Sequence, residues 1–171
     1  ERILESGSSE TVSNTETRKI ILGTDLSLTA KTMRSVGNIE NSGPVPPQAD
    51  TPTTYTIVWD ISNTFNQVSN AEVRATLPSY VEWTGVYEPS SESLSYDSAN
   101  HQIVWKAGSI LSGAGINSSS KEVRFQVKFL PSVNQIGQVP VLVDAASLTA
   151  IDKVTGAKIE TSAPEVTINF Y

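Results

Sequence analysis

The sequence is poor in the residues that most often carry chemistry: it has no cysteine, one histidine and one methionine in 171 residues. Without cysteine the chain has no disulfide, no thiolate metal site and no cysteine nucleophile. Its histidine, His101, lies in the turn sequence "SANHQ", where a solvated turn residue is expected rather than a general base. The chain also lacks the motifs Gly-x-Ser-x-Gly and His-Glu-x-x-His. We therefore predict that it is not an enzyme and has no catalytic residue.

Clusters of basic residues are missing too. The 12 Lys and Arg residues are scattered, and the net charge is −6 with a pI of about 4.8. Phosphate backbones and anionic membrane surfaces are bound by a concentrated basic face, so neither nucleic acid nor a membrane surface is predicted as a partner. The stretch "GAGINSSS", around Gly113 and Gly115, lacks the lysine and the helix of a nucleotide-binding loop, and we interpret it as a hairpin loop.

Long hydrophobic runs are absent. The longest, "VPVLV" at 139–143, is far shorter than the ~20 residues that span a bilayer, so membrane insertion is not predicted. The opening "ERILESGSSE" also has no apolar run of the kind that marks a signal peptide. If the protein is exported, we expect the given chain to be a mature form or part of a longer protein.

What the sequence does contain is alternation of apolar and polar residues, the period of a half-buried β-strand. It is clearest at 55–63 and 121–129, and it recurs at 19–31, 71–77, 81–87 and 93–105. A long, more uniformly apolar strand is predicted at 138–152, and a last strand at 165–171 with Val166, Ile168 and Phe170 inward. The predicted core contains Tyr55, Ile57, Trp59, Ile61, Val73, Leu77, Trp83, Trp105, Phe125 and Val127.

These segments predict an all-β fold with roughly eight or nine strands at short spacing and no helical periodicity. An Ig-like antiparallel β-sandwich is favoured over an up-and-down barrel, because the strands are uneven and a proline-rich connection near residues 37–53 is long. We expect a flexible N-terminal arm at 1–18 and a single sandwich domain at 19–171.

The order of the segments resembles the Ig-like conserved-repeat domain of large bacterial and archaeal surface proteins. In that family a Tyr-x-Ile strand ends in Asn, a second strand stops at Leu-Pro, and a Val-x-Trp or Val-x-Phe strand follows. The matching residues are Tyr55, Ile57, Asn63, Leu77, Pro78, Val81 and Trp83. Later segments, "IVWKAGSILSGAG", "KEVRFQVKF" and "PVLVDAASLTAIDKVTGAKI", are also similar, so the resemblance covers roughly residues 20–170. It implies extracellular display as a stalk, adhesin or envelope building block, without catalysis.

Several residues raise a ligand or metal hypothesis beside this structural one. Calcium takes about six to eight oxygens, and no Asp-x-Asp-x-Asp spacing occurs, so no cofactor is predicted and calcium remains the alternative. Its candidate ligands are Asp25, Asp50, Asp60, Asp97, Asp144 and Asp152. The tryptophans Trp59, Trp83 and Trp105 suggest a glycan platform, although core packing is the favoured interpretation.

The sequence also offers two candidate covalent features. A Lys–Asn cross-link would join Lys31 or Lys19 to Asn169, but Asn169 alternates with the inward residues of its strand, whereas such a bond needs burial. The triplet Asn117-Ser118-Ser119 is a weak glycosylation sequon in a predicted exposed loop. Solvated polar residues are the favoured interpretation of both.

The functional prediction is a non-catalytic structural or adhesive module at the cell surface, with a ligand-binding surface domain for a glycan or calcium as the alternative. Predicted partners are other copies of the chain, neighbouring surface domains, or a glycan or cell-surface ligand. The short apolar segment Lys19, Ile20, Ile21 and Leu22 follows a polar arm, so it is a candidate inter-subunit strand for pairing with a neighbour's sheet edge. A disordered leader to an ordinary first strand is the favoured interpretation of the same segment.

Overall fold

The alternating segments form strands in the computed structural model, which describes residues 15–34, 36–135 and 137–168. Residues 1–14 of the expected arm, together with Asn169 and Phe170, lie outside the described residues. One short 3₁₀ helix, η1, accompanies the strands. The elements are β1 (Leu26–Met33), β2 (Thr53–Asn63), β3 (Val68–Thr76), β4 (Val81–Glu88), β5 (Ser93–Asp97), β6 (Gln102–Ile110), β7 (Lys121–Phe129), η1 (Val133–Gln135), β8 (Val141–Val143), β9 (Ala146–Asp152), β10 (Lys158–Ala163) and β11 (Val166–Thr167).

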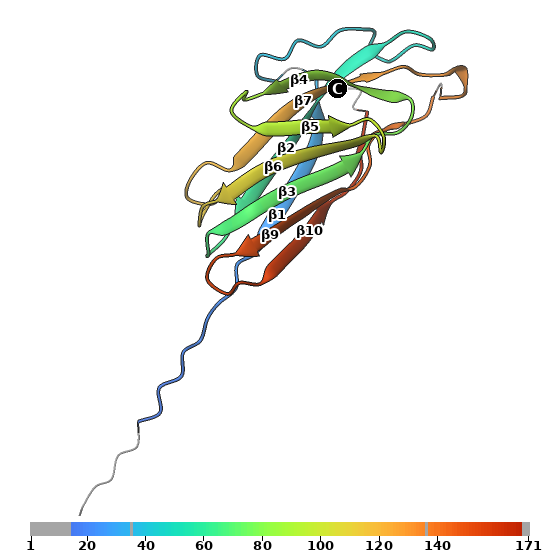
Figure 1. The fold of residues 1–171 in the computed structure, drawn as a ribbon. Helices are drawn as coiled ribbons and strands as arrows, with labels where there is room; N and C mark the ends of the chain where they lie inside the picture. The colour runs from blue at the N-terminus through green and yellow to red at the C-terminus, as the bar shows by residue number, and fades with distance from the viewer. Residues whose placement is uncertain (1–14, 35, 136, 169–171) are drawn as a thin grey trace, which may run out of the picture.

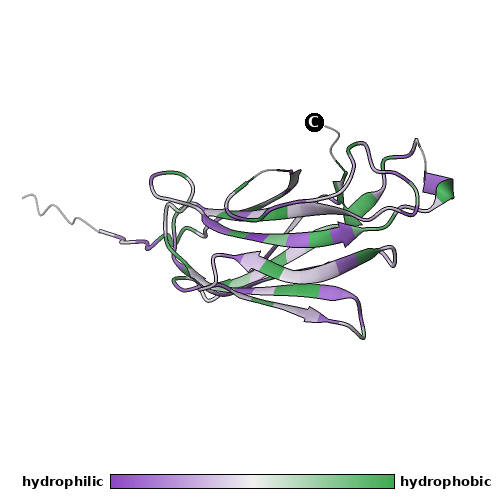
Figure 2. Cartoon of the chain, turned by 90° about the horizontal axis from the view of Figure 1, so that it is seen from above, coloured by the Kyte–Doolittle hydropathy of each residue, from purple (hydrophilic) through white to green (hydrophobic). Residues whose placement is uncertain are grey.

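Two antiparallel sheets face each other and make the predicted Ig-like sandwich (Figure 1). The first sheet has four strands in the order β1-β2-β7-β4, and the second has five in the order β10-β9-β3-β6-β5. Figure 2 shows the two sheets as separate layers, which rules out the barrel alternative. β8 and β11 form a small two-stranded sheet of their own. The prediction of eight or nine main strands is therefore confirmed.

The core lies between the layers and is built by the period-2 pattern of the long strands. Tyr55, Ile57, Trp59 and Ile61 of β2 are fully buried, and the register places Ile57 opposite Phe125 of β7. Burying such large apolar side chains is the main stabilising term of the fold. The edge-to-face packing of Trp59 on Phe125, with 4.8 Å between ring centroids, adds to it.

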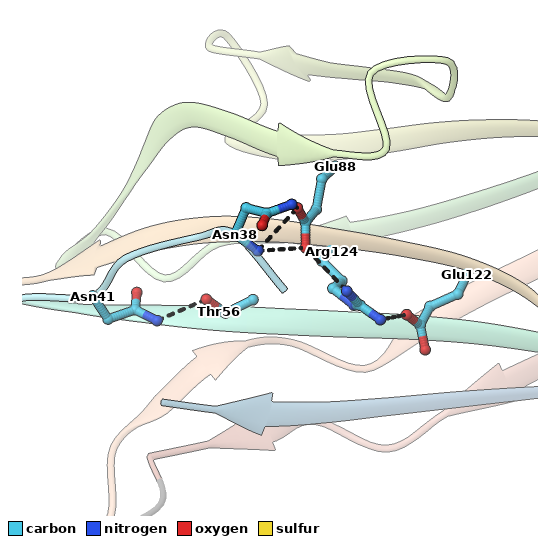
Figure 3. A network of polar contacts seen from close by, with 6 residues as sticks. All are labelled: Asn38, Asn41, Thr56, Glu88, Glu122 and Arg124. Carbon is cyan, nitrogen blue, oxygen red and sulfur yellow. Dashed lines mark hydrogen bonds and ion pairs between the residues drawn. The ribbon is translucent and has the colours of Figure 1, made fainter. Parts of the chain in front are cut away.

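The proline-rich loop (residues 36–52) packs across the outer face of the four-stranded sheet. Ile39 is buried there, and Gln126 donates from Nε2 to the carbonyl of Glu40 at 2.7 Å. Asn41 donates from Nδ2 to the Thr56 hydroxyl, also at 2.7 Å (Figure 3). This cover explains why the outward residues Thr56 and Gln126 are buried although the alternation alone predicts that they are exposed.

The first strand begins later than predicted. Residues 19–25 have no secondary structure, and pairing starts where Leu26 meets Asn63, the last residue of β2. Lys19 to Leu22 lie beyond the end of β2 and find no strand partner within the described residues. These residues therefore form no strand although their sequence suits one, because a strand also needs a neighbouring strand to pair with.

The prediction of one long strand at 138–152 is wrong. It divides into β8, which pairs with β11, and β9, which lies between β10 and β3. At the break, the backbone N–H of Asp144 donates to the carbonyl of Thr76 at 3.0 Å, and both Asp144 and Ala145 are exposed. The apolar character of the segment is explained because β8 and β9 both contribute to the core.

The two ends of the sandwich differ in what they carry, and we name them by the chain's path (Figure 1). The arm pole holds Thr24, the turn 64–67, the loop 111–120 and the turn 153–157. The exit pole holds the proline-rich loop, the connection 130–140, and β8 with β11, after which the last described residue is Ile168. No helix in the described parts of the chain is long and apolar enough to cross a membrane.

Candidate functional site

A polar cluster, buried except for the half-buried Asn66, anchors the chain where it enters the sandwich at the arm pole. We call Thr24, Asn63, Asn66 and Asp152 the arm junction. The Thr24 hydroxyl donates to Asn63 Oδ1 at 2.6 Å, and the Thr24 backbone N–H donates to Asp152 Oδ2 at 3.2 Å. Asn63 donates in turn from Nδ2 to the carbonyls of Asn66 and Leu111, at 2.8 and 2.9 Å. These bonds tie the entering segment to β2, to the loop after β6 and to the end of β9.

Asp152 is the charged member of the arm junction and is 1% exposed. Asn66 donates from Nδ2 to its Oδ2 at 3.0 Å, and the backbone N–H groups of Val154 and Thr155 donate to its Oδ1. The hydrogen bond from Asn66, followed by those from the backbone, outweighs burial and lowers the pKa of Asp152 to about 2. The group is therefore an ionised acceptor that holds a turn, and it is not poised to take up a proton near neutral pH.

A second polar cluster, whose contacts Figure 3 shows, lies beside β4 and β7 and lines an open groove of about 750 Å³. Arg124 lies between two carboxylates, 3.0 Å from Glu88 and 2.6 Å from Glu122, and the Asn38 backbone N–H also donates to Glu88. Partial desolvation raises the pKa of Glu88, but the hydrogen bonds from Arg124 and Asn38 outweigh it and hold the pKa below its ordinary value. The groove thus contains ion pairs rather than an acid–base couple.

The six aspartates of the calcium hypothesis are not brought together. Asp25, Asp50 and Asp144 are exposed, and Asp97 closes its own turn by accepting from the Ala99 N–H at 3.0 Å. Asp60 accepts a hydrogen bond from Ser120, and Asp152 belongs to the arm junction. In the described parts of the chain, no three His, Cys, Asp or Glu side chains are grouped to hold a metal ion. The absence of a cofactor nevertheless stays a prediction.

His101 and Asn117 occupy a turn and a loop, as the sequence predicts. His101 is exposed with a positive φ of 51°, and its Nδ1 lies 3.0 Å from the Tyr96 hydroxyl. The loop 111–120 closes on itself, because the Gly113 carbonyl accepts from the N–H of Asn117 at 3.0 Å. Asn117 is exposed there. Lys31 is exposed on β1, and its proposed cross-link partner Asn169 lies outside the described residues.

The tryptophans divide into two buried and one half-buried. Trp59 and Trp105 are fully buried, and Trp105 donates from Nε1 to Glu92 at 2.9 Å. Trp83, predicted in the core, is only partly buried, because the bulged edge strand β4 leaves it at the rim of the sandwich. It packs among Tyr87, Tyr96 and Phe125, with ring centroids 5.9 to 6.4 Å away. Its ring is nearly parallel to that of Phe125, with an angle of 16° between the planes.

The remaining predicted core residues are all buried between the sheets. Val73 and Leu77 come from β3 and the residue that follows it, whereas Phe125 and Val127 come from β7. Lys19, Ile20, Ile21 and Leu22 of the candidate inter-subunit strand are all exposed. Among them, the Leu22 carbonyl accepts a hydrogen bond from Asn66 at 2.6 Å, which connects the segment to the arm junction.

An apolar cavity at the exit pole was not identified from the sequence. It measures about 280 Å³ and lies between the proline-rich loop and the connection 130–140. We call it the proline pocket, and its apolar lining consists mainly of Pro46, Pro47, Phe129, Pro131, Val139, Pro140 and Ile168. The sequence marked the early prolines only as strand breakers, since nothing in the linear pattern shows that prolines some 85 residues apart line one cavity.

The comparisons with known proteins find resemblance of fold only. No family model matches the chain, and no curated protein sequence does. Among solved structures, the major pilin SpaD of Corynebacterium diphtheriae is 14% identical with a TM-score of 0.48, over 83% of this chain and 35% of that one. The BcpA major pilin variant of Bacillus cereus is 13% identical with a TM-score of 0.47, over 84% of this chain and 40% of that one.

A third structure holds the three N-terminal domains of Mfa5, a type V pili tip protein of Porphyromonas gingivalis. It is 16% identical with a TM-score of 0.47, over 63% of this chain and 22% of that one. The chain therefore spans less than half the length of each of these structures. At such identities and TM-scores, no role of those proteins is carried over to this chain.

Proposed function

We propose that this chain is a non-catalytic, load-bearing module of an extracellular or envelope-associated surface protein. The observation that carries the proposal is the path of the chain, which enters at the arm pole and leaves at the exit pole (Figure 1). Modules joined in series through such ends would each add the full length of the sandwich. The resemblance of the sequence to the Ig-like conserved-repeat domain supports the same role and the same location.

The entering end is fastened along the direction in which it would be pulled. Thr24 is fixed by the arm junction, and β1 then pairs with β2 over its whole length of eight residues, from Leu26 opposite Asn63 to Met33 opposite Thr56. A force along β1 loads these hydrogen bonds in shear. Because they must then break together rather than one after another, this geometry resists extension.

The leaving end is fastened in the same sense. β10 runs beside β9 over six residues, and the β11 that follows it is tied to β1, since the Thr32 hydroxyl donates to the Thr167 carbonyl at 2.6 Å. The Ile168 backbone N–H also donates to the Pro140 carbonyl at 3.1 Å. Both terminal strands are therefore loaded lengthwise and in opposite directions.

Single-molecule force spectroscopy tests the proposal, and the lack of cysteine makes attachment unambiguous. A variant with Arg18→Cys and Glu165→Cys is pulled lengthwise. The matched control, with Arg18→Cys and Phe65→Cys, is pulled from one pole, so β1 and β2 separate bond by bond. We expect the lengthwise geometry to unfold at a force at least about twofold higher, because forced unfolding follows the barrier along the pulled path. Equal forces in the two geometries would refute a load-bearing role.

We further propose that residues 19–22 contact a neighbouring subunit rather than their own domain. The exposure of Ile20, Ile21 and Leu22 supports this, since three adjacent aliphatic side chains in water favour burial against a partner. Removing residues 1–22 retains Thr24 and the arm junction, so the domain is expected to fold. Sedimentation velocity should then show a smaller assembly than the full chain forms, and an unchanged assembly state would reject the contact.

A further inference from the structure

Exposed large apolar side chains gather at the two poles, and the sides of the sandwich carry almost none. Only Val86, on β4, lies away from both poles among the exposed large apolar residues of the described chain. The arm pole has Ile20, Ile21, Leu22, Phe65, Leu111, Ile116, Ile151 and Val154, whereas the exit pole has Val45, Leu130, Val133 and Val139. Exposed apolar surface that is concentrated in patches marks sites of association. The distribution therefore favours contacts from pole to pole.

The two patches have complementary shapes. At the arm pole, Ile20, Ile21 and Leu22 project from a segment without secondary structure and are 82%, 49% and 64% exposed. At the exit pole, the proline pocket is a concave site of about 280 Å³. This is slightly below the ~300–1,000 Å³ of typical small-molecule sites, and it suits a few aliphatic side chains.

The segment cannot reach the pocket of its own chain. Ile20 is four residues from Thr24, so it extends at most ~14 Å from the arm junction. Thr24 is bonded to Asn63 at one end of β2, whereas Phe129 of the pocket lies opposite Thr53 at the other end. The ten residue steps between Thr53 and Asn63 span ~33 Å in an extended strand. An occupant supplied by this sequence must therefore come from a second copy.

Charge at the two poles is complementary as well. Lys19 directly precedes the apolar segment and is exposed. Asp50 is exposed at the rim of the pocket, next to the lining residue Ala49, and its backbone N–H donates to the carbonyl of Pro131 in the pocket wall at 2.9 Å. With Ile20, Ile21 and Leu22 in the pocket, the preceding Lys19 would lie at the rim near this carboxylate, which favours one orientation of the incoming chain.

We propose that the proline pocket receives Ile20, Ile21 and Leu22 of a second copy, so that copies stack head to tail. This deepens the proposed function and rests on it. The contact joins two different surfaces, so it does not close on itself, and repeated use of it generates an open chain of subunits. Each copy would leave its own pocket available to the next, and the arm junction would fix the direction in which the segment projects.

Cysteine cross-linking between two single-cysteine variants tests the contact directly. One variant carries Ile21→Cys, and the other carries Val139→Cys at the pocket rim. Val86→Cys on the side of the sandwich is the matched control, because Val86 and Val139 are 45% and 57% exposed. In full-length protein mixed under oxidised glutathione, we expect the Ile21–Val139 pair to cross-link at least about tenfold faster than the Ile21–Val86 pair, because docking raises the local concentration of the two thiols.

Each other outcome rejects the proposal. Equal rates for the two pairs would mean random collision, and faster coupling of Val139→Cys with itself would mean a symmetric contact between exit poles. A second measurement does not depend on cysteine chemistry: Leu22→Asp should weaken self-association, whereas Val86→Asp should not. The force measurement uses one molecule at a time, so a load-bearing role can stand if cross-linking fails. If the truncation lowers the assembly state without specific cross-linking, the arm binds elsewhere on its neighbour.

Discussion

The two poles hold the chain by opposite means. At the arm pole, Thr24, Asn63 and Asp152 are buried and joined by directional hydrogen bonds, which accept only one arrangement of their partners. At the exit pole, proline rings, Phe129 and Ile168 line a cavity whose apolar walls impose no such direction. The polar cluster therefore fixes the entering chain in one arrangement, whereas the apolar cavity leaves open the orientation of a side chain packed against it. Four changes test this difference, from the largest expected effect to the smallest.

Asn63→Ala is expected to have the largest effect. It removes the acceptor of the Thr24 hydroxyl and the donor to the Asn66 and Leu111 carbonyls in a buried site. We expect a loss of about 2–4 kcal/mol in the free energy of unfolding, measured with urea. The control Asn134→Ala changes an exposed residue at the exit pole and should stay within about 0.5 kcal/mol. Similar losses in both variants would remove the distinction between the poles.

Gly43→Ala tests how firmly the proline-rich loop is held. Gly43 has a φ of +93°, and an added Cβ would lie 2.4 Å from the Pro52 carbonyl oxygen. We expect a loss of about 1–3 kcal/mol by chemical denaturation, because both the backbone conformation and the contact become strained. Gly23→Ala in the arm is the matched variant, since nothing lies within 4 Å of its added Cβ. If both glycines tolerate alanine equally well, the loop is not fixed against the sheet as described.

Acid should weaken the arm junction in particular. The pKa of Asp152 is about 2 in the folded chain and 3.8 ordinarily, so its stabilisation is complete above the ordinary value and is lost as the pH falls through about 2. Asp152→Asn should be less stable than wild type at neutral pH, and urea midpoints of the two proteins should converge between about pH 4 and pH 2. The exposed Glu165→Gln variant should follow the wild type throughout. A constant difference between Asp152→Asn and wild type would contradict this account.

Calcium is expected to have the smallest effect. A ligand that binds only the folded state raises its melting temperature, whereas the six aspartates here lie in separate surroundings. We expect the Tm in excess calcium and in chelator to agree within about 1 °C. A clear rise in Tm with calcium would support the ligand-binding alternative. Asp25→Asn and Asp144→Asn would then show which pole holds the ion.

Prediction from the sequence succeeded where every second residue of a strand is buried. The alternation in β2 and β7 predicted the inward residues Ile57, Trp59 and Phe125, and the turn residues around Asp97 located the β5–β6 hairpin. It failed where the formation of a strand, or the sheet to which it belongs, depends on its pairing partner. Lys19 to Leu22 have the pattern of a strand but lie beyond the end of β2, and residues 138–152 are divided between two different sheets.

The candidate sites were predictable only in part. Asn63 already stood out as the asparagine that ends a strand in the repeat-domain pattern, although its role in binding Thr24 was not foreseen. Trp83 was expected in the core, but a bulge in an edge strand shifts it to the rim. Bulges and edges depend on which strands become neighbours, and this information is spread along the whole chain.

By itself the sequence determined the fold class, the main core and the absence of cysteine chemistry, because these depend on residue type and on a local period of two. Only the tertiary structure decided that Thr24, Asn63 and Asp152 meet at one pole and that Pro46 and Pro140 line one cavity at the other. Such meetings join residues up to 128 positions apart in the chain. They arise from the pairing order of the strands, which no short segment encodes.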